Sequence, residues 1–299
     1  MATATILVLV APAGQDLAEL VPLSALVRLA GCEVDWLDRP HAAQLPFPAK
    51  DRSRLQEVEA LLAGRPVDRA LLPAHGRRKR LLLCDMDSTV ITVECIDELA
   101  ARAGLGAEVA ALTRRAMAGE IPFADALVRR VSLLAGLPVR VIDEILRERV
   151  RLQPGARRLV ATMRAHGAFC ALVSGGFTEF TRHVRVLAGF DADYANTLEI
   201  RDGVLTGRVL PPLLGPEAKL HTLLHLARRF RLDLADTLAI GDGANDLDMV
   251  RTAGLGIAFR GHAVLRASAD ACIDHADLTA ALYFQGFRRE EMVELGEPD

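Results

Sequence analysis

Short apolar runs and amphipathic stretches alternate along most of the 299 residues of this chain. Residues 81–84, 168–173 and 237–240 are runs without a charged residue, which is typical of strands buried on both faces of a sheet. Between them, residues 156–165 and 217–229 have apolar positions at helical spacing. This order predicts an α/β fold built on a parallel sheet that helices cover.

The first 75 residues have the pattern of a separate, smaller unit. A chain of this length favours about two domains, and this stretch contains no cluster of acid–base or metal-binding residue types. We expect a small α/β domain over residues 1–75 and a larger domain over residues 76–299, with the basic run at 77–80 as an exposed linker. In the smaller unit we expect strands at 6–10, 33–37 and 69–72, helices at 17–29 and 52–62, and a proline-rich loop at 40–48.

A helical block interrupts the alternation after residue 90. Apolar residues recur at helical spacing in four stretches, at 94–103, 107–118, 123–134 and 139–150. Because the block separates the first strand of the larger unit from the second, it predicts a helical cap inserted at about residues 93–152. Lids of this kind exclude water from a site and complete it.

Composition and charge argue against several classes of protein. The net charge of −3 provides no basic surface for nucleic acid or for an anionic membrane. The five cysteines are scattered without a Cys-x-x-Cys spacing, so neither a zinc ribbon nor a disulfide framework is indicated, and a reduced, cytoplasmic setting is favoured. The apolar stretch at residues 4–12 lacks a preceding Lys or Arg and is too short to span a bilayer, so we expect no signal peptide.

Two carboxylates directly follow the first core strand. Asp85 and Asp87 come after residues 81–84, and ligands of open α/β sheets bind outside the carboxyl ends of the strands. Acids two positions apart at a strand end point the same way, so both face one site. Taken alone, the stretch is equally compatible with a helix cap or a turn, because Asp, Ser and Thr favour both.

Two later segments suit an anion. Residues 174–178, Ser-Gly-Gly-Phe-Thr, lie between a strand and a helix, where free N–H groups converge, although a plain tight turn has the same composition. Lys219 lies on the next predicted helix. His221 and His225 on that helix have the spacing of metal ligands but no acidic partner motif, and we interpret them as a helix flank.

The last core strand ends in Gly241-Asp242-Gly243-Ala244-Asn245-Asp246, where glycines permit close approach of the backbone. Carboxylates from Asp85 and Asp242 suit Mg²⁺, a hard cation that takes few carboxylates together with phosphate and water. Backbone amides and Lys219 suit a phosphoryl group. A carboxylate nucleophile with a second acid nearby suits covalent phosphoryl transfer through an aspartyl phosphate.

These segments resemble the motifs of one enzyme superfamily. The resemblance rests on Asp85-Met86-Asp87-Ser88-Thr89, Ser174-Gly175, Lys219 and Gly241-Asp242-Gly243-Ala244-Asn245-Asp246. They are similar to the four motifs of the haloacid dehalogenase superfamily of phosphatases. The closer resemblance, to phosphoserine phosphatases, adds Glu94-Cys95-Ile96-Asp97-Glu98, Met117, Phe123, Arg130-Val131-Ser132-Leu133-Leu134 and residues 174–178. It extends from about residue 81 to 287 and does not securely cover residues 1–75.

The resemblance implies a Rossmann-like core with an inserted helical cap and a Mg²⁺-dependent hydrolysis of O-phosphoserine, the last step of serine biosynthesis. Asp85 is implied as the nucleophile and Asp87 as the residue that protonates the leaving oxygen and then activates water. Asp85, the backbone carbonyl of Asp87 and Asp242 are implied as the Mg²⁺ ligands. The implied phosphoryl-binding residues are Ser174, Gly175, Lys219 and Asn245, with Gly176 and Asp246 in support.

The resemblance also assigns substrate recognition to the cap. Glu94 and Arg130 are implied to bind the amino and carboxylate groups of the substrate, while Met117 and Phe123 close the pocket. One acid and one arginine complement the two charges of an amino acid. For an isolated Glu or Arg, and for the neighbouring Arg129, a solvated surface position is the common alternative.

Other functions stay open from the sequence. The same motifs suit a phosphotransferase that passes the phosphoryl group to an amino-acid hydroxyl such as that of homoserine. A signalling module that only stores an aspartyl phosphate is disfavoured, because storage needs neither Asp87 nor a cap. The implied partner is a small-molecule substrate, without nucleic acid or membrane. Residues 1–75 are long enough for an ACT-like regulatory domain, and a homodimer is compatible with the resemblance.

Overall fold

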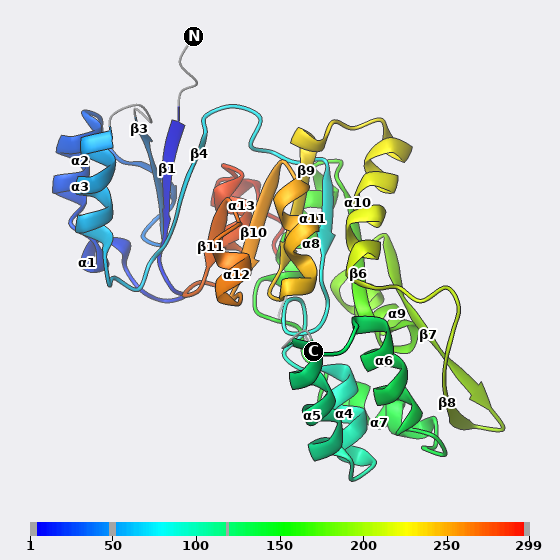
Figure 1. Ribbon diagram of the computed structural model, residues 1–299. Helices are drawn as coiled ribbons and strands as arrows, with labels where there is room; N and C mark the ends of the chain where they lie inside the picture. Colours follow the sequence, from blue (N-terminus) through cyan, green and yellow to red (C-terminus); the bar gives the residue numbers. More distant parts are fainter. Residues whose placement is uncertain (1–4, 48–51, 118–119, 296–299) are drawn as a thin grey trace.

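The computed structural model describes residues 5–47, 52–117 and 120–295, which form two sheets (Figure 1). The strands are β1 (Thr5–Val10), β2 (Asp35–Asp38), β3 (Ala42–Phe47), β4 (Asp68–Pro73), β5 (Leu81–Cys84), β6 (Phe169–Phe177), β7 (Ala192–Arg201), β8 (Val204–Leu210), β9 (Thr237–Gly241), β10 (Leu255–Phe259) and β11 (Ala271–Ile273). The α-helices are α1 (Leu17–Leu20), α2 (Leu23–Ala30), α3 (Arg52–Leu62), α4 (Cys95–Arg102), α5 (Gly106–Met117), α6 (Phe123–Ser132), α7 (Arg140–Glu148), α8 (Ala156–Ala165), α9 (Thr178–Ala188), α10 (Pro216–Phe230), α11 (Leu247–Thr252), α12 (Ala263–Arg266) and α13 (Ala280–Phe284).

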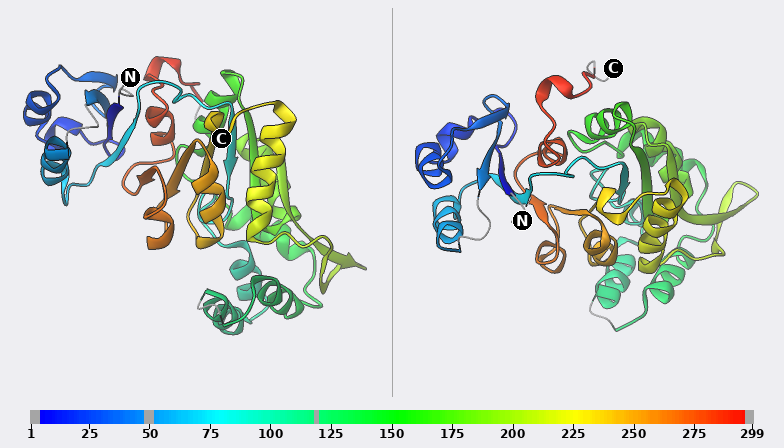
Figure 2. Two further views of the ribbon diagram at one scale, coloured as in Figure 1. Left: turned by 45° about the horizontal axis from the view of Figure 1, so that its top comes forward. Right: turned by 90° about the horizontal axis from the view of Figure 1, so that it is seen from above.

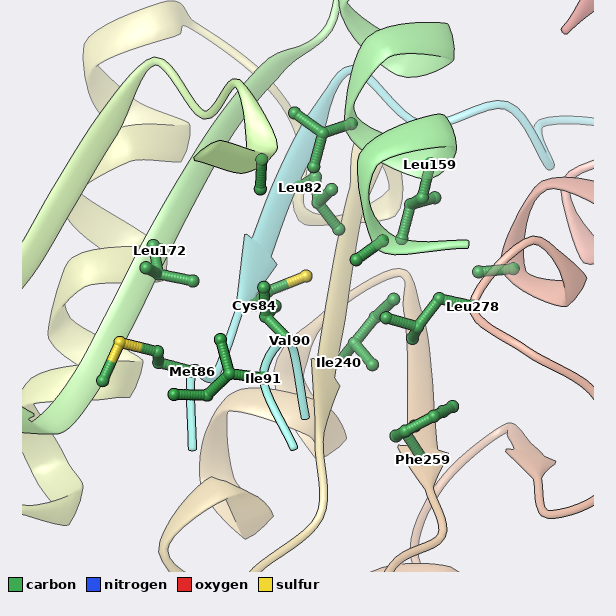
Figure 3. Packing of buried hydrophobic residues seen from close by; sticks show 14 of the residues in the cluster. Leu82, Cys84, Met86, Val90, Ile91, Leu159, Leu172, Ile240, Phe259 and Leu278 are labelled. Carbon is green, nitrogen blue, oxygen red and sulfur yellow. The ribbon is translucent and has the colours of Figure 1, made fainter. Parts of the chain in front are cut away.

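Strand β5 lies in the middle of the larger sheet, whose order is β11-β10-β9-β5-β6-β7-β8. It pairs in parallel with β6 on one side and with β9 on the other. Leu82 and Cys84 belong to the apolar cluster on one face of the sheet, whereas Leu81 and Leu83 belong to the cluster on the opposite face (Figure 3). The predicted α/β fold with a buried parallel core is therefore confirmed, because every residue of β5 is fully buried.

The topology brings three strand ends together. The chain continues from β5 to β6 on one side and later returns to β9 on the other side, so the strand order reverses at β5. A crevice forms at such a switch point, outside the carboxyl ends of the strands. The motif residues after β5 and β9, together with the end of β6, therefore lie at one place.

The inserted helices α4 to α7 form a cap beyond the carboxyl ends of the strands (Figures 1 and 2). The two linkers that join the cap to the core pair with each other at an isolated bridge between Ile91 and Leu152. Backbone hydrogen bonds of 3.0 Å from Thr92 and 2.8 Å to Val90 extend this pairing. The cap also contacts the β7–β8 hairpin, where the Gly136 amide donates to the Leu205 carbonyl at 2.8 Å.

The N-terminal sheet has the order β2-β3-β1-β4 with antiparallel pairing, which gives the βαββαβ arrangement of a split βαβ fold. Helices α1, α2 and α3 cover one face of this sheet, the face on which Leu9 and Leu45 lie. The other face, which includes Val10 and Leu72, shares a core with Leu278 and other residues of the C-terminal segment. This sheet is therefore fastened to the larger unit by apolar packing.

Several local predictions differ from the structure. The predicted loop at residues 40–48 contains strand β3; its Pro46 lies beyond the part of β3 that pairs with β2, where a missing amide hydrogen is tolerated. The predicted helix at 17–29 is broken into α1 and α2 next to Pro22.

The basic run is not a freely exposed linker. Arg77 is half-buried and donates to the Gln44 side chain at 2.8 Å, and Lys79 donates to the Ala235 carbonyl at 2.7 Å. The charge of the run alone could not predict these contacts, because the acceptors are a side-chain carbonyl and a backbone carbonyl from other parts of the chain. In the described residues, no helix is long and apolar enough to cross a membrane.

Asp68 is the polar anchor between the two units. Its side chain is 3% exposed and accepts hydrogen bonds from the amides of Asp274, His275 and Ala276 at 2.8, 3.1 and 2.7 Å. Burial raises the pKa of Asp68 although these amides act in the opposite direction. The carboxylate therefore stabilises the interface mainly by satisfying three partly or fully buried N–H groups.

Replacing Asp68 by alanine is expected to lower the free energy of unfolding by about 3 kcal/mol, because buried amides are left without acceptors. Urea denaturation of the full chain measures the change. Glu59→Ala is the matched control: it removes an exposed 2.6 Å ion pair with Arg69 on the same strand, and such pairs contribute about 0–1 kcal/mol. Equal effects of the two substitutions would show that Asp68 is not an anchor.

Candidate active site

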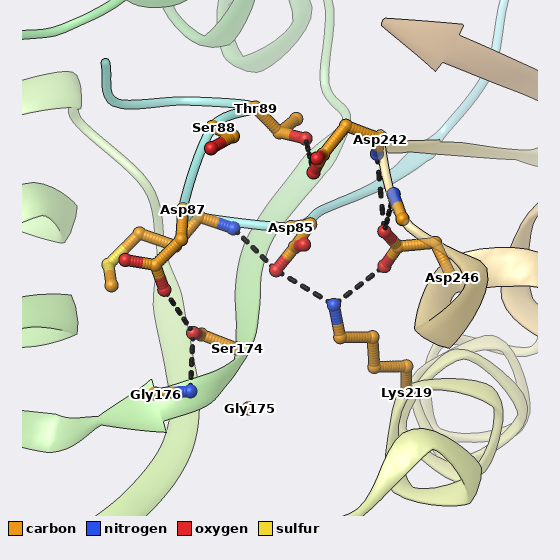
Figure 4. A network of polar contacts seen from close by, with 12 residues as sticks. Asp85, Asp87, Ser88, Thr89, Ser174, Gly175, Gly176, Lys219, Asp242 and Asp246 are labelled. Carbon is orange, nitrogen blue, oxygen red and sulfur yellow. Dashed lines mark hydrogen bonds and ion pairs between the residues drawn. The ribbon is translucent and has the colours of Figure 1, made fainter. Parts of the chain in front are cut away.

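A buried ion network lies at the carboxyl end of β5 (Figure 4). The Lys219 ammonium on α10 is 2.8 Å from Oδ1 of Asp85 and 2.6 Å from Oδ1 of Asp246. Asp246 is completely buried, and Lys219 is 2% exposed. Burial lowers the pKa of Lys219, but the charges of Asp246 and Asp85 outweigh it and hold the pKa above its usual value. The lysine therefore stays protonated and fixes both carboxylates.

Asp85 is oriented by a second donor. The amide of Met86 donates to the same Oδ1 at 2.7 Å, so both contacts of this carboxylate with described residues involve one oxygen. Burial, followed by the charge of Asp246, raises the pKa of Asp85 well above its usual range, while Lys219 acts in the opposite direction. One lysine does not balance the negative charge around Asp85.

Asp242, at the end of β9, completes a group of three acids with Asp85 and Asp246 whose ligand oxygens all lie within 4.8 Å of one another. Burial, then the charge of Asp246, raises the pKa of Asp242 to about 6. Three carboxylates face a single ammonium, which leaves an excess of two negative charges when all are ionised. This donor set fits a divalent cation with oxygen ligands.

The hydrogen bonds distinguish the three acids. Both carboxylate oxygens of Asp246 already have partners. Oδ1 faces Lys219, and Oδ2 accepts from the amides of Asp242 and Gly243 at 3.2 and 3.0 Å. Asp242 accepts from the Thr89 hydroxyl at 2.9 Å through Oδ1. Asp85 and Asp242 are therefore better suited to hold a cation, and Asp246 is suited to hold Lys219 and the glycine loop.

Asp87 lies on the other side of Asp85 (Figure 4). Its Oδ1 accepts from the Cys95 amide at 2.9 Å, at the start of cap helix α4, and its Oδ2 accepts from the Ser174 hydroxyl at 3.0 Å. This carboxylate thus connects the cap with β6. The Ser174 hydroxyl in turn accepts from the Gly176 amide at 2.8 Å.

The segment at residues 174–178 is neither the anion-binding loop before a helix N-terminus that the sequence favours nor the plain tight turn that it also allows. Strand β6 continues to Phe177, and its pairing with β7 shifts register after Val173. A Cβ atom on Gly176 would lie 3.0 Å from both the Asp87 carboxylate and the Ser174 hydroxyl, so a larger residue would press on both groups. The amides for an anion come from an irregular strand end instead of a helix terminus.

Glu94 is the N-cap residue of α4, and its Oε1 accepts from the Ser88 hydroxyl at 2.6 Å. Its side chain keeps contact with solvent, yet the surrounding protein atoms and then the charge of Asp87 raise the pKa of Glu94 to about 7. Ser88 has a φ of 57°, an uncommon conformation for a residue other than glycine.

Arg130 is half-buried on α6. Its contacts with described residues are long, 3.3 Å to the Ala126 carbonyl and 3.3 Å to the Thr113 hydroxyl. Burial lowers the pKa of Arg130, and the charges of Asp97 and Glu94 act in the opposite direction. The guanidinium group remains charged, and its donors are poorly used by the protein. Arg129, by contrast, is exposed.

The remaining expected residues are placed as follows. A Cβ atom on Gly175 would come within 3.2 Å of the Phe123 ring, so Phe123 reaches from the cap to the end of β6. Asn245 is half-buried in the glycine loop. Met117 ends α5, but its side chain lies outside the described part of the structure. His221 and His225 are exposed, in agreement with a helix flank.

Sequence reasoning missed Asn196. It is 1% exposed on β7, and its amide donates to the carbonyls of Gly175 and Leu214 at 2.9 and 3.2 Å and accepts from the Leu214 amide at 2.8 Å. A polar residue in an otherwise unremarkable strand carries little information. Its position opposite Phe177, beside the glycine segment, depends on a strand register that the sequence does not state.

Known proteins resemble this chain in sequence. The profile of haloacid dehalogenase-like hydrolases matches residues 82–251, more than half of the chain. A phosphoserine phosphatase of Mycobacterium tuberculosis is 45% identical over 216 residues, which are 72% of this chain and 53% of that protein. This chain therefore spans about half the length of the relatives that it matches at this identity.

Two solved structures resemble the fold. A haloacid dehalogenase family hydrolase from Salmonella enterica serovar Typhi has a TM-score of 0.83 and 28% identity, and the match covers 94% of this chain and 98% of that one. A structure described as a phospho-aspartyl intermediate analogue of phosphoserine phosphatase has a TM-score of 0.65 and 39% identity, covering 69% and 99%. With the profile match and the shared sequence, these findings show that the chain belongs to the haloacid dehalogenase-like hydrolase family.

Proposed function

We propose that this chain is a phosphatase that hydrolyses O-phosphoserine to serine and phosphate. One observation carries the proposal: Asp85, Asp87 and Lys219 converge at the end of β5 (Figure 4), where a hydrogen bond joins Asp87 to a cap that provides an acid and an under-used arginine. The names of the relatives support the substrate. The serine-biosynthetic role and a cytoplasmic location follow from that substrate and remain predictions.

In the proposed reaction, the free oxygen of Asp85 attacks the phosphorus. A bond forms between phosphorus and this oxygen while the bond from phosphorus to the serine oxygen breaks, and Asp87 gives its proton to the departing oxygen. Lys219 holds Oδ1 of Asp85, which leaves the other oxygen oriented for attack. Lys219 is also within reach of the negative charge that the phosphoryl group brings.

In the second half-reaction, Asp87 takes a proton from a water molecule, whose oxygen then attacks the phosphorus. The bond between Asp85 and phosphorus breaks, phosphate leaves, and Asp87 is protonated again for the next cycle. The geometry supports this double role, because the Cys95 amide and the Ser174 hydroxyl fix both oxygens of Asp87. Positioning of this kind lowers the entropic cost of proton transfer.

We further propose Mg²⁺ as the cation, held by Asp85, Asp242 and the backbone carbonyl of Asp87. A bound Mg²⁺ neutralises negative charge and polarises phosphoryl oxygens. The fit rests on the excess of carboxylates over ammonium groups at this site. Thr89 fixes the orientation of Asp242, and Asp246 keeps Lys219 in place. Ser174, Gly175 and Asn245 are proposed to bind phosphoryl oxygens.

Substrate choice is proposed to lie in the cap. Glu94 complements the amino group of phosphoserine, and Arg130 complements its carboxylate with a planar pair of donors. The long contacts of Arg130 leave it free to accept a better partner. Phe123 reaches the Gly175 segment and excludes water above it. For Met117, a role in closing the pocket is proposed from the family resemblance alone.

Residues 1–75 are proposed to form a domain of their own. They have a separate sheet and a separate apolar cluster, and they contribute none of the proposed site residues. An ACT-like regulatory role and a homodimer also remain proposals. The packing of Val10 and Leu72 against the C-terminal segment adds a structural role for this unit.

Asp85→Asn is expected to remove all measurable phosphate release, because the amide is a poor nucleophile for a reaction that enzymes accelerate by up to roughly 10²¹-fold. Asp242→Ala is expected to lose the Mg²⁺-dependent activity. Phosphate release with Mg²⁺ and with chelator measures both, and His221→Ala on the surface of α10 is the control. Normal turnover by pure Asp85→Asn protein would exclude the mechanism, and transfer to added homoserine instead of phosphate release would indicate a phosphotransferase.

Arg130→Ala is expected to lower kcat/KM for phosphoserine by about 10²-fold, which corresponds to roughly 3 kcal/mol for a lost charged hydrogen bond. An aryl phosphate without a carboxylate should be affected far less. Arg129→Ala is the matched control, because Arg129 is adjacent in sequence but exposed. The ratio of the two kcat/KM values is the readout. A parallel decline for both substrates would assign Arg130 to the phosphoryl group or to folding.

A chain that begins at Arg77 is expected to keep turnover per folded molecule, because every proposed site residue is retained. Its free energy of unfolding should decrease, since the apolar surface around Leu278 and Tyr283 becomes exposed. Circular dichroism with phosphatase assays measures both properties. A folded but inactive product would contradict the proposed division of labour between the two units.

A further inference from the structure

We propose that Asn196 is a positioning residue for the reaction, an inference that rests on the phosphatase activity proposed above. Its amide holds the Gly175–Gly176 peptide and acts through this peptide on Ser174 and Asp87. Asn196 does not itself face the reacting atoms. It lies on β7, opposite Phe177 of β6.

The Gly175–Gly176 peptide needs such support. Register between β6 and β7 is lost after Val173 and resumes only at Phe177, so regular strand pairing does not hold the intervening peptides. Two glycines in succession add conformational freedom. The Asn196 amide supplies a 2.9 Å hydrogen bond to the Gly175 carbonyl at this gap.

The peptide is held at both ends. Its carbonyl, on Gly175, accepts from Asn196, while its amide, on Gly176, donates to the Ser174 hydroxyl at 2.8 Å. The hydroxyl then donates to Oδ2 of Asp87 at 3.0 Å (Figure 4). These three hydrogen bonds form a series in which each donor faces the next group on the way to Asp87. Hydrogen bonds aligned in this way polarise one another.

Asn196 is also fixed from behind. It donates to the Leu214 carbonyl at 3.2 Å and accepts from the Leu214 amide at 2.8 Å. Leu214 precedes Gly215, the N-cap residue of α10, and α10 is the helix that carries Lys219. With 1% exposure, Asn196 has no alternative partner in water. One buried amide thus connects the segment beside Asp87 with the segment that leads to Lys219.

The proposal predicts a loss in turnover. In its ionised form, Asn196→Asp keeps the size of the side chain and its acceptor for Leu214 but has no proton to donate to the Gly175 carbonyl. Misplacement of a catalytic group by about 1 Å costs about 10²-fold, so we expect kcat to decrease by about 10- to 100-fold for both phosphoserine and an aryl phosphate. The decrease should fall on kcat more than on KM, because Asp87 acts in the chemical steps.

A double-mutant cycle with Ser174→Ala tests the route. If Asn196 acts through Ser174, the Asn196→Asp substitution should have little further effect on kcat once the hydroxyl is absent. A residue that only stabilises the fold would instead give additive effects. Additive losses, or an unchanged kcat per folded molecule, would overturn the inference.

Thr181→Val is the matched control. Thr181, on α9, is fully buried and donates at 2.7 Å to Asp193, which lies on β7 as Asn196 does. The melting temperature of this variant should decrease while kcat stays within about twofold, because the lost hydrogen bond is not part of the route from Asn196 to Asp87. Asn196→Ser, with a smaller polar group, repeats the cycle if Asn196→Asp does not fold.

An inactive parent chain overturns the proposed function and this inference together, whereas an active parent with additive losses overturns this inference alone.

Discussion

The structure of the site depends on one buried charge. Lys219 is nearly inaccessible to water, and a lysine in that position is tolerable only when carboxylates surround it. Asp85 and Asp246 meet this requirement from two strands that are neighbours in the sheet but distant in sequence. The order of the strands, the glycine loop around Asp246 and the position of α10 are all constrained by this contact. The remaining negative charge is what makes the site suitable for a cation.

The sequence was sufficient to predict the buried central strand and the acids that follow it. It was insufficient to predict elements farther from the site, such as β3. Runs such as residues 81–84 are recognisable, because a strand buried on both faces has no polar position. The acids directly after this run indicated a site only together with residues 174–178, Lys219 and residues 241–246. The strand β3 was predicted as a loop because prolines dominate the local pattern, whereas pairing with β1 determines the outcome. Such pairing is a long-range property that local propensity does not contain.

The same limit applies to Asn196 and to the basic run. Asn196 matters because of the carbonyls around it, and backbone groups are not written in a sequence. Arg77 and Lys79 were expected in solvent on the basis of charge, but their acceptors come from Gln44 and Ala235 in other parts of the chain. Reading residue types therefore finds chemistry that the side chains carry and misses chemistry that depends on the backbone.

The paired linkers of the cap have a consequence for how this enzyme family diversifies. The chain leaves the core and returns to it at neighbouring points, which the bridge between Ile91 and Leu152 holds together. The number and arrangement of residues between these points hardly affect the entropy of closing the core, because closure depends only weakly on loop length. A different cap can thus be inserted at the same junction without disturbing β5 or β6. In the proposed function, substrate choice and phosphoryl chemistry are then separately replaceable parts of one chain.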